Sequence, residues 1–198
     1  VLDRRSRGKW YVSYLQQTQL PNVSGLTDTG EDVKQARAAL IGNHTQYLTD
    51  TLLLRANANL VTDPNYFQQL SNSGILRASP SSESNLLVTQ RLPYGNLYLL
   101  GLYLQPLQAG GKDTFQRLPE AGYSLPHVSL FNSPILLGME GNYVNFYRDQ
   151  GFTLNRINVV PSISTDVLHL GHVIGVRPQA KIREVYYSRR AQSDGGQH

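Results

Sequence analysis

The chain has 198 residues, a formal net charge of +4 and no cysteine. This length fits one domain, here predicted to span residues 1–198, that buries a substantial core. The absence of cysteine excludes disulfides, a thiolate metal site and a cysteine nucleophile. Hydrophobic residues make up 40% of the sequence, and no uninterrupted apolar stretch approaches the roughly 20 residues of a membrane-spanning helix.

The first third of the chain predicts one short element and one long helix. Residues 10–15 alternate loosely between apolar and polar and fit a strand or a short helix. Residues 21–30 are a predicted loop, after which a helix is expected to run as far as Asp63 with a possible break near Gly42. The apolar and bulky residues with helical spacing are Val33, Ala36, Leu40, Tyr47, Leu48, Thr51 and Leu52.

The rest of the chain predicts a strand-rich centre followed by helices. Residues 86–89 and 97–104 are expected to be strands joined by a turn at 93–96. Short helices are predicted after Gly141 and over residues 163–170. A final helix is predicted over 179–190 because Pro178 suits the position before it. The predicted fold class is therefore α+β, with helices packed before and after a sheet.

Two tyrosine motifs are the main chemical signal. Tyr98 follows Gly95-Asn96-Leu97, and Tyr143 follows Gly141-Asn142. Two tyrosine rings can hold a flat ring between them, as in the stacking of an unpaired nucleic-acid base. The chain contains twelve tyrosines, so a coincidental pair on half-buried strands is the alternative explanation.

Basic residues crowd the C-terminal stretch. They are Arg177, Lys181, Arg183, Arg189 and Arg190. Such clusters favour phosphate backbones or anionic membrane surfaces. On the predicted last helix, Gln179, Ile182, Arg183 and Tyr186 share one face. Arg183 is then either a polarising group at the floor of a site or a snorkelling side chain.

The order of these motifs resembles the ribosome-inactivating proteins, which are rRNA N-glycosylases. The resemblance rests on the Tyr98 strand, on Gly141-Asn142-Tyr143, on Arg156-Ile157 and on residues 178–183. It covers residues 86–190 and suits a compact, fungal-type member of the family. The chain departs from the family pattern at Gln179, which occupies the place of the catalytic glutamate.

The resemblance implies an enzyme that removes one adenine from an exposed loop of large-subunit rRNA and so inhibits protein synthesis. Tyr98 and Tyr143 would sandwich the flipped base, and Arg183 would hold the adenine as it leaves. Either Gln179 would position water, or a glutamate from elsewhere, first of all Glu184, would supply the carboxylate.

The same resemblance implies a monomer that acts on ribosomes without a cofactor or metal, either in the cytoplasm or after secretion. Arg177, Lys181 and Arg189 would contact RNA phosphates, and Glu140 is a second candidate for the carboxylate. Two alternatives remain open from the sequence. One is a non-enzymatic structural or carbohydrate-binding protein, and the other is a ribonuclease that uses His127 or His169.

Overall fold

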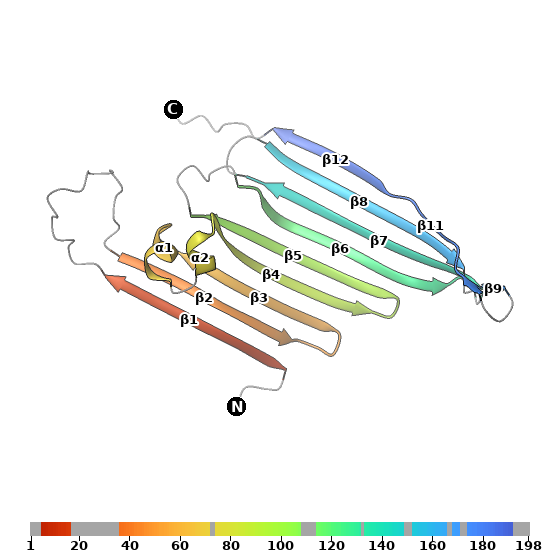
Figure 1. Ribbon diagram of the computed structural model, residues 1–198, viewed down its shortest axis with the longest axis horizontal. Helices are drawn as coiled ribbons and strands as arrows, with labels where there is room; N and C mark the ends of the chain where they lie inside the picture. Colours follow the sequence, from red (N-terminus) through yellow and green to blue (C-terminus); the bar gives the residue numbers. More distant parts are fainter. Residues whose placement is uncertain are drawn as a thin grey trace.

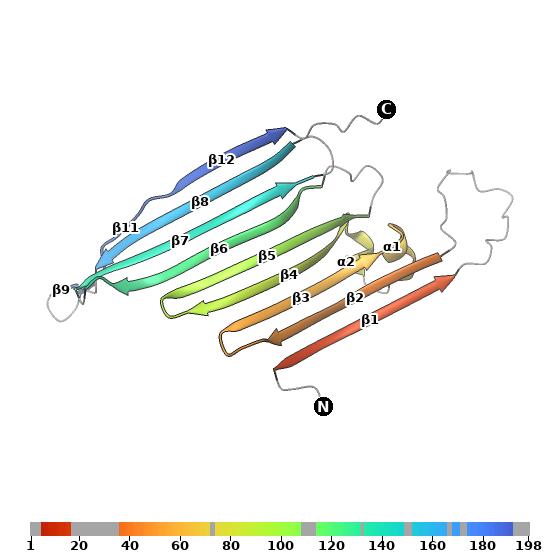
Figure 2. The ribbon, with the colours of Figure 1, turned by 180° about the vertical axis from the view of Figure 1, so that it is seen from behind.

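The computed structural model describes residues 5–16, 36–71, 74–107, 114–131, 133–148, 152–165, 168–170 and 174–191. Its main feature is one wide antiparallel sheet in which each strand lies beside the next strand of the chain (Figures 1 and 2). The strands in this order are β1 (Ser6–Gln16), β2 (Ala36–Tyr47), β3 (Leu52–Val61), β4 (Ser81–Leu92), β5 (Gly95–Pro106), β6 (Gln116–Ser129), β7 (Ile135–Tyr147) and β8 (Phe152–Thr165).

The far side of β8 pairs with two strands. These are β11 (Gln179–Lys181) and β12 (Glu184–Ala191), each antiparallel to β8. A separate two-stranded sheet joins β9 (Leu168–Leu170) to β10 (Ile174–Val176). Two helices of five residues each, α1 (Tyr66–Leu70) and α2 (Gly74–Ala78), lie between β3 and β4 in the chain.

The predicted α+β class is wrong, because the described chain is nearly all strand. The long helix expected up to Asp63 is instead the β2–β3 hairpin in the part that the structure describes. Residues 17–35, which include the predicted loop and the start of that helix, lie outside the described residues. The helical spacing was misleading because it combined side chains from two strands and the turn between them.

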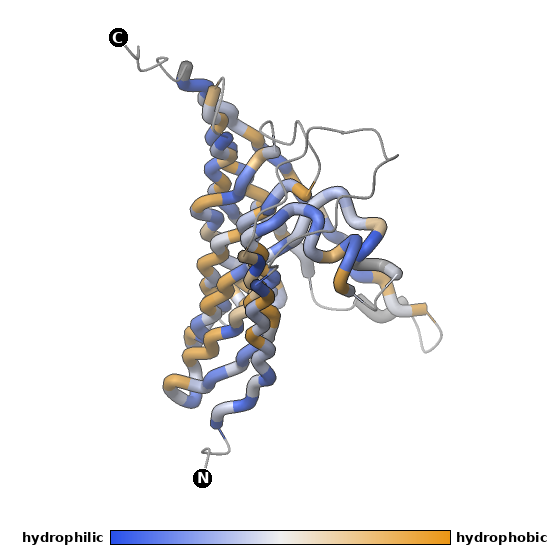
Figure 3. Tube along the Cα trace, turned by 90° about the vertical axis from the view of Figure 1, so that its left-hand side faces the viewer, coloured by the Kyte–Doolittle hydropathy of each residue, from blue (hydrophilic) through white to orange (hydrophobic). Residues whose placement is uncertain are grey.

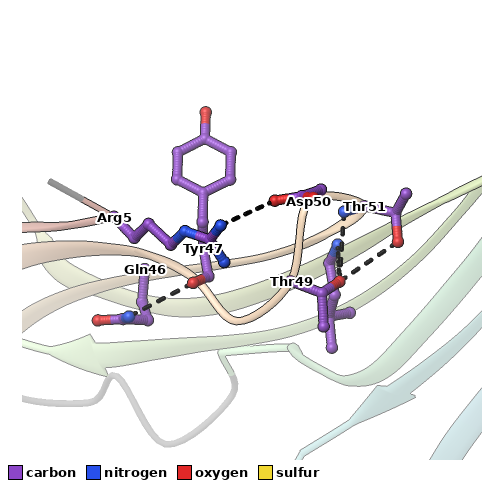
Figure 4. Close-up of polar contacts among 7 residues, drawn as sticks. Arg5, Gln46, Tyr47, Thr49, Asp50 and Thr51 are labelled. Atoms are coloured by element: carbon purple, nitrogen blue, oxygen red, sulfur yellow. Dashed lines mark hydrogen bonds and ion pairs between the residues drawn. The ribbon is translucent and has the colours of Figure 1, made fainter. Parts of the chain in front are cut away.

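The turn between β2 and β3 is held by short-range polar contacts (Figure 4). The Thr49 hydroxyl accepts hydrogen bonds from the backbone N–H groups of Thr51 at 3.2 Å and Leu52 at 3.0 Å. The Asp50 carboxylate lies 3.2 Å from the guanidinium of Arg5, which precedes β1. This turn therefore links three adjacent strands at one end of the sheet.

The predictions of three later helices are also wrong. Gly141 and Asn142 lie in the middle of β7, and β8 continues to Thr165 before β9 begins. Residues 179–190 comprise β11, two connecting residues and most of β12. The strands predicted over 86–89 and 97–104 are confirmed within β4 and β5, and residues 10–15 form part of β1.

Side chains alternate between two faces along each strand, and the register aligns these faces across the sheet. In β3, one face carries only apolar residues, namely Leu52, Leu54, Ala56, Ala58 and Leu60. The other carries Leu53, Arg55, Asn57, Asn59 and Val61. We call these the apolar face and the polar face, and Figure 3 shows the resulting alternation of colour along the strands.

The two helices pack on the polar face at the ends of β2 and β3 (Figure 1). Helix α1 contributes Tyr66 and Phe67 to a small core that also contains Ala39, Val61 and Leu107, with Ile41 packed against it. The Tyr66 hydroxyl shares a hydrogen bond with Ser13 of β1. The helices therefore cover one end of the polar face and leave the rest of that face open.

Candidate functional site

Charge is distributed unequally between the two faces. In strands β1 to β8, the pairing register places every Lys, Arg, Asp and Glu on the polar face. These residues are Arg7, Lys9, Arg37, Arg55, Glu83, Arg91, Arg117, Glu120, Glu140 and Arg156. The apolar face of the same strands carries one titratable imidazole, that of His44.

The apolar face exposes large hydrophobic side chains over many strands. Trp10 and Leu99 are each 50% exposed. Other exposed apolar side chains on this face are Leu40, Leu60, Leu86, Leu97, Met139, Ile157 and Ile163. Exposed large apolar side chains on so many strands of one face indicate contact with a membrane or another protein rather than with water.

A hydrogen-bonded group occupies the middle of the polar face. The Tyr98 hydroxyl donates to Glu120 Oε1 at 2.8 Å, and the Arg117 guanidinium lies 3.7 Å from the other oxygen of Glu120. The Tyr98 ring lies over Gly122 of the neighbouring strand, where an added Cβ would come within 2.3 Å of the ring. Any larger residue beneath the tyrosine would displace its ring from this position, and the carboxylate of Glu120 is already engaged by two partners.

A polar hollow lies beside this group, between β7, β8 and the start of β12. Its volume is about 290 Å³. We call it the arginine hollow, and it is lined by Asn142, Arg156, Asn158, Arg183, Val185 and Tyr187. The register explains the grouping, because Asn142 and Val185 both pair with Asn158, and Tyr187 pairs with Arg156.

Several polar groups of this hollow are unpaired. The Nε of Arg156 and the Oδ1 of Asn142 are buried without a hydrogen-bond partner. Within the described part of the chain, neither Arg156 nor Arg183 lies within 4.0 Å of a carboxylate. A buried polar group without a partner is uncommon in a folded protein, so the hollow has the donors of a ligand site.

Stacked arginines and phenylalanines border the hollow toward the end of β7. The Arg148 guanidinium lies 4.5 Å from the centre of the Phe152 ring and 4.9 Å from that of Phe115. Arg189 lies 3.9 Å from the centre of the Phe152 ring. Cation–π contacts of this kind hold the cations in place without neutralising them.

The two predicted base-stacking tyrosines lie on opposite faces of the sheet. Tyr98 is on the polar face, whereas Tyr143 is on the apolar face, where its hydroxyl donates to Asn155 Oδ1 at 3.0 Å. They therefore cannot hold one ring between them. The Gly-Asn-Tyr motif belongs to the alternation of β7 and does not open a helix.

Four of the remaining predicted site residues lie on β11, on β12 or between these two strands. Arg183 lines the arginine hollow, whereas Glu184 begins β12 on the opposite face. Gln179 lies 3.3 Å from His127, and Lys181 pairs with Ser162 of β8.

Three further predicted residues do not line the hollow. Arg189 is stacked on Phe152, Glu140 lies on the polar face of β7, and Arg177 lies between β10 and β11. The backbone of His169 forms part of β9, and its side chain lies outside the described part.

Sequence reasoning missed Asn142, Arg156 and Asn158 as parts of a ligand site. Their proximity depends on the register between β7 and β8, which no local motif reveals. Assigning alternate residues of each strand to opposite faces would have separated the charged side chains from the exposed apolar ones.

The described segments contain neither a metal-binding cluster nor a helix that could span a membrane. No group of three or more His, Asp or Glu residues there is arranged to hold a metal ion. Likewise, no helix within the described residues has the length and apolar character to cross a membrane.

Residues 35–198 match the model of the family described as LptD, LPS transport system D. No curated protein shows a significant match to the sequence. The family match overturns the resemblance to ribosome-inactivating proteins. The predictions of an rRNA N-glycosylase, of a toxin and of a ribosomal partner are therefore wrong, because the matched family is described as an LPS transport system.

Proposed function

Because the chain belongs to the LptD family, described as LPS transport system D, we propose that it serves lipopolysaccharide transport as a membrane-embedded sheet. Its apolar face contacts the lipid hydrocarbon. Its polar face is separated from lipid and is available to the anionic glycan part of lipopolysaccharide.

The distribution of charge carries this proposal. Strands β1 to β8 keep their Lys, Arg, Asp and Glu side chains on the polar face across eight consecutive strands. A cationic side chain at the lipid-facing midplane of a strand costs roughly 2–4 kcal/mol. A water-exposed sheet has no such penalty and no reason to keep one face free of these charges.

Strand length agrees with the proposal. The strands from β1 to β8 contain 10 to 14 residues. At about 3.3 Å per residue each reaches some 33–46 Å, whereas a bilayer core is about 30 Å thick. Tilted strands of this length therefore cross the hydrocarbon and extend beyond it.

Trp10 gives a direct test because it is the only tryptophan and lies exposed on the apolar face. The protein would be reconstituted in vesicles whose phospholipids carry bromine atoms on the acyl chains, which quench tryptophan at short range. The proposal predicts blue-shifted emission from Trp10 and strong quenching.

A matched pair of variants separates the two faces. In a Trp10→Phe background, Leu99→Trp places the probe on the apolar face, and Leu100→Trp places it one residue along on the polar face. The first should be quenched strongly and the second weakly. Equal quenching at both positions, or none at either in a folded sample, would rule out the membrane-embedded sheet.

A further inference from the structure

We propose that the arginine hollow is an anion-binding site that takes a phosphate group. The proposal rests on the proposed function in one respect, since it names a phosphate of lipopolysaccharide as the source of the anion.

The first argument is the uncompensated charge of Arg156 and Arg183. Three other arginines among the described residues, Arg5, Arg37 and Arg117, each lie within 4.0 Å of a carboxylate. Arg156 and Arg183 have no such carboxylate within 4.0 Å among the described residues. They nevertheless line the same hollow, Arg156 from β8 and Arg183 from the residue before β12.

Among the described residues, no nearby carboxylate forms an ion pair with Arg156 or Arg183. Glu120 accepts from Tyr98 and faces Arg117. Glu140 lines two neighbouring depressions, one with Lys181 and one with Asn142 and Asn158, but among the described residues it forms no ion pair within 4.0 Å with Arg156 or Arg183. Glu184 projects to the opposite face of β12. An anion entering the hollow therefore meets two guanidinium groups that no carboxylate neutralises.

The second argument is the unsatisfied polar atoms that line the hollow. The buried Arg156 Nε needs an acceptor, and the buried amide of Asn142 has an oxygen without a donor. A guanidinium presents paired N–H donors that fit two phosphate oxygens. The amides of Asn142 and Asn158 can donate to a third oxygen or accept from an adjoining sugar hydroxyl.

The shape of the hollow limits the ligand to a head group. Its volume of about 290 Å³ is at the lower end for small-molecule sites, so it admits a phosphate with part of one sugar. Tyr187 on its rim is 57% exposed and offers a flat ring for that sugar. The acyl chains of the same molecule would remain on the lipid side.

The test compares lipopolysaccharide binding by the full chain and by an Arg183→Gln variant. Radiolabelled rough-type lipopolysaccharide in detergent is the first probe, and the same material dephosphorylated with hydrofluoric acid is the second. Arg183 is exposed between two strands, so its replacement leaves the sheet intact. Loss of one charge-assisted contact should weaken binding of the phosphorylated probe by about tenfold or more. Binding of the dephosphorylated probe should be equal for both proteins.

Two control variants remove one arginine charge each, at positions outside the hollow. Arg55→Gln removes an exposed arginine of the polar face on β3, and Arg190→Gln removes one on the opposite face of β12. Both should bind the phosphorylated probe within about twofold of the parent protein, whereas equal losses in all three variants would indicate a general charge effect and overturn the site.

A titration with inorganic phosphate alone separates the two sources of the anion. Phosphate binding that is lost in Arg183→Gln, without any lipopolysaccharide binding, would keep the anion site and contradict lipopolysaccharide as its source. Lipopolysaccharide binding that is unchanged in Arg183→Gln would refute the site and leave the proposed function standing.

Discussion

Arg37 and Arg183 mark two differently built regions on the polar face of one sheet. Arg37 lies under α1, where its Nε is 2.7 Å from Asp63 Oδ2 and its guanidinium also bonds to Gln69. The side chains of this ion pair are only 5% and 8% exposed. Arg183 is exposed at the rim of an open hollow and has no such carboxylate among the described residues.

The contrast shows how one face serves two purposes. Where α1 lies on the sheet, the buried charges of Arg37 and Asp63 are paired with each other, and the same helix contributes Tyr66 and Phe67 to the small apolar core. Where the sheet is uncovered, arginines are held by strand register and aromatic rings and keep their charge available. The covered region stabilises the fold, and the open region is suited to a ligand.

The strongest way to break the covered region is Arg37→Ala. This change leaves the buried Asp63 without its partner, and removal of one member of a buried pair costs about 3–5 kcal/mol. The free energy of unfolding, measured by urea titration in vesicles, should fall by that amount. Arg55→Ala on the exposed part of the same face should change it by less than about 0.5 kcal/mol. Similar losses in both variants would mean that α1 does not bury the pair.

A charge on the apolar face tests the difference between the two faces. Leu99→Arg places a guanidinium beside Val88 and Ala121 and should reduce stability in vesicles by about 2–4 kcal/mol. Asn57→Arg, between Asn43 and Asn85 on the polar face, is the matched variant and should cost well under half as much. Because Leu99 is half exposed in the isolated sheet, a small loss for Leu99→Arg would argue for a water-facing surface.

Tyr98→Phe probes the junction between the covered and open regions. The substitution removes the donor to Glu120 and leaves Arg117 as the remaining partner of that carboxylate. A cost of about 1–2 kcal/mol is expected for this hydrogen bond to a charged group. Tyr94→Phe, at an exposed turn tyrosine, provides the comparison by the same unfolding measurement and should be neutral.

Arg5→Ala should have the smallest effect. Arg5 faces Asp50 at 3.2 Å, but the two side chains are 54% and 89% exposed. An exposed pair of this kind contributes roughly 0–1 kcal/mol, and that contribution should disappear at high salt. If Arg5→Ala were as damaging as Arg37→Ala, burial would not explain the difference between the two ion pairs.

Part of the sheet was predictable from local patterns. Residues 97–104 form a short apolar run behind a Pro-Tyr-Gly-Asn turn, which is sufficient to predict β5 and its hairpin with β4. The β3 alternation from Leu52 to Leu60 is equally regular. It was overlooked because apolar residues spaced by three or four, such as Val33, Ala36 and Leu40, also fit a helix.

The candidate site was less accessible to sequence reasoning. Arg183 was singled out as a site residue on a predicted helix, whereas it lies between two strands. Its neighbours Asn142 and Arg156 lie on different strands and are 14 residues apart in the sequence. Their proximity follows from hydrogen-bond register, which is set by the whole sheet rather than by either segment.

The nearest-neighbour order of the sheet also has an evolutionary consequence. Because each strand from β2 to β7 pairs with the strands before and after it in the chain, a hairpin can be inserted or deleted there without rerouting any other connection. An even number of strands is gained or lost each time, so the direction of every later strand is preserved. Relatives of this chain can therefore differ in sheet width by whole hairpins while keeping the same two faces.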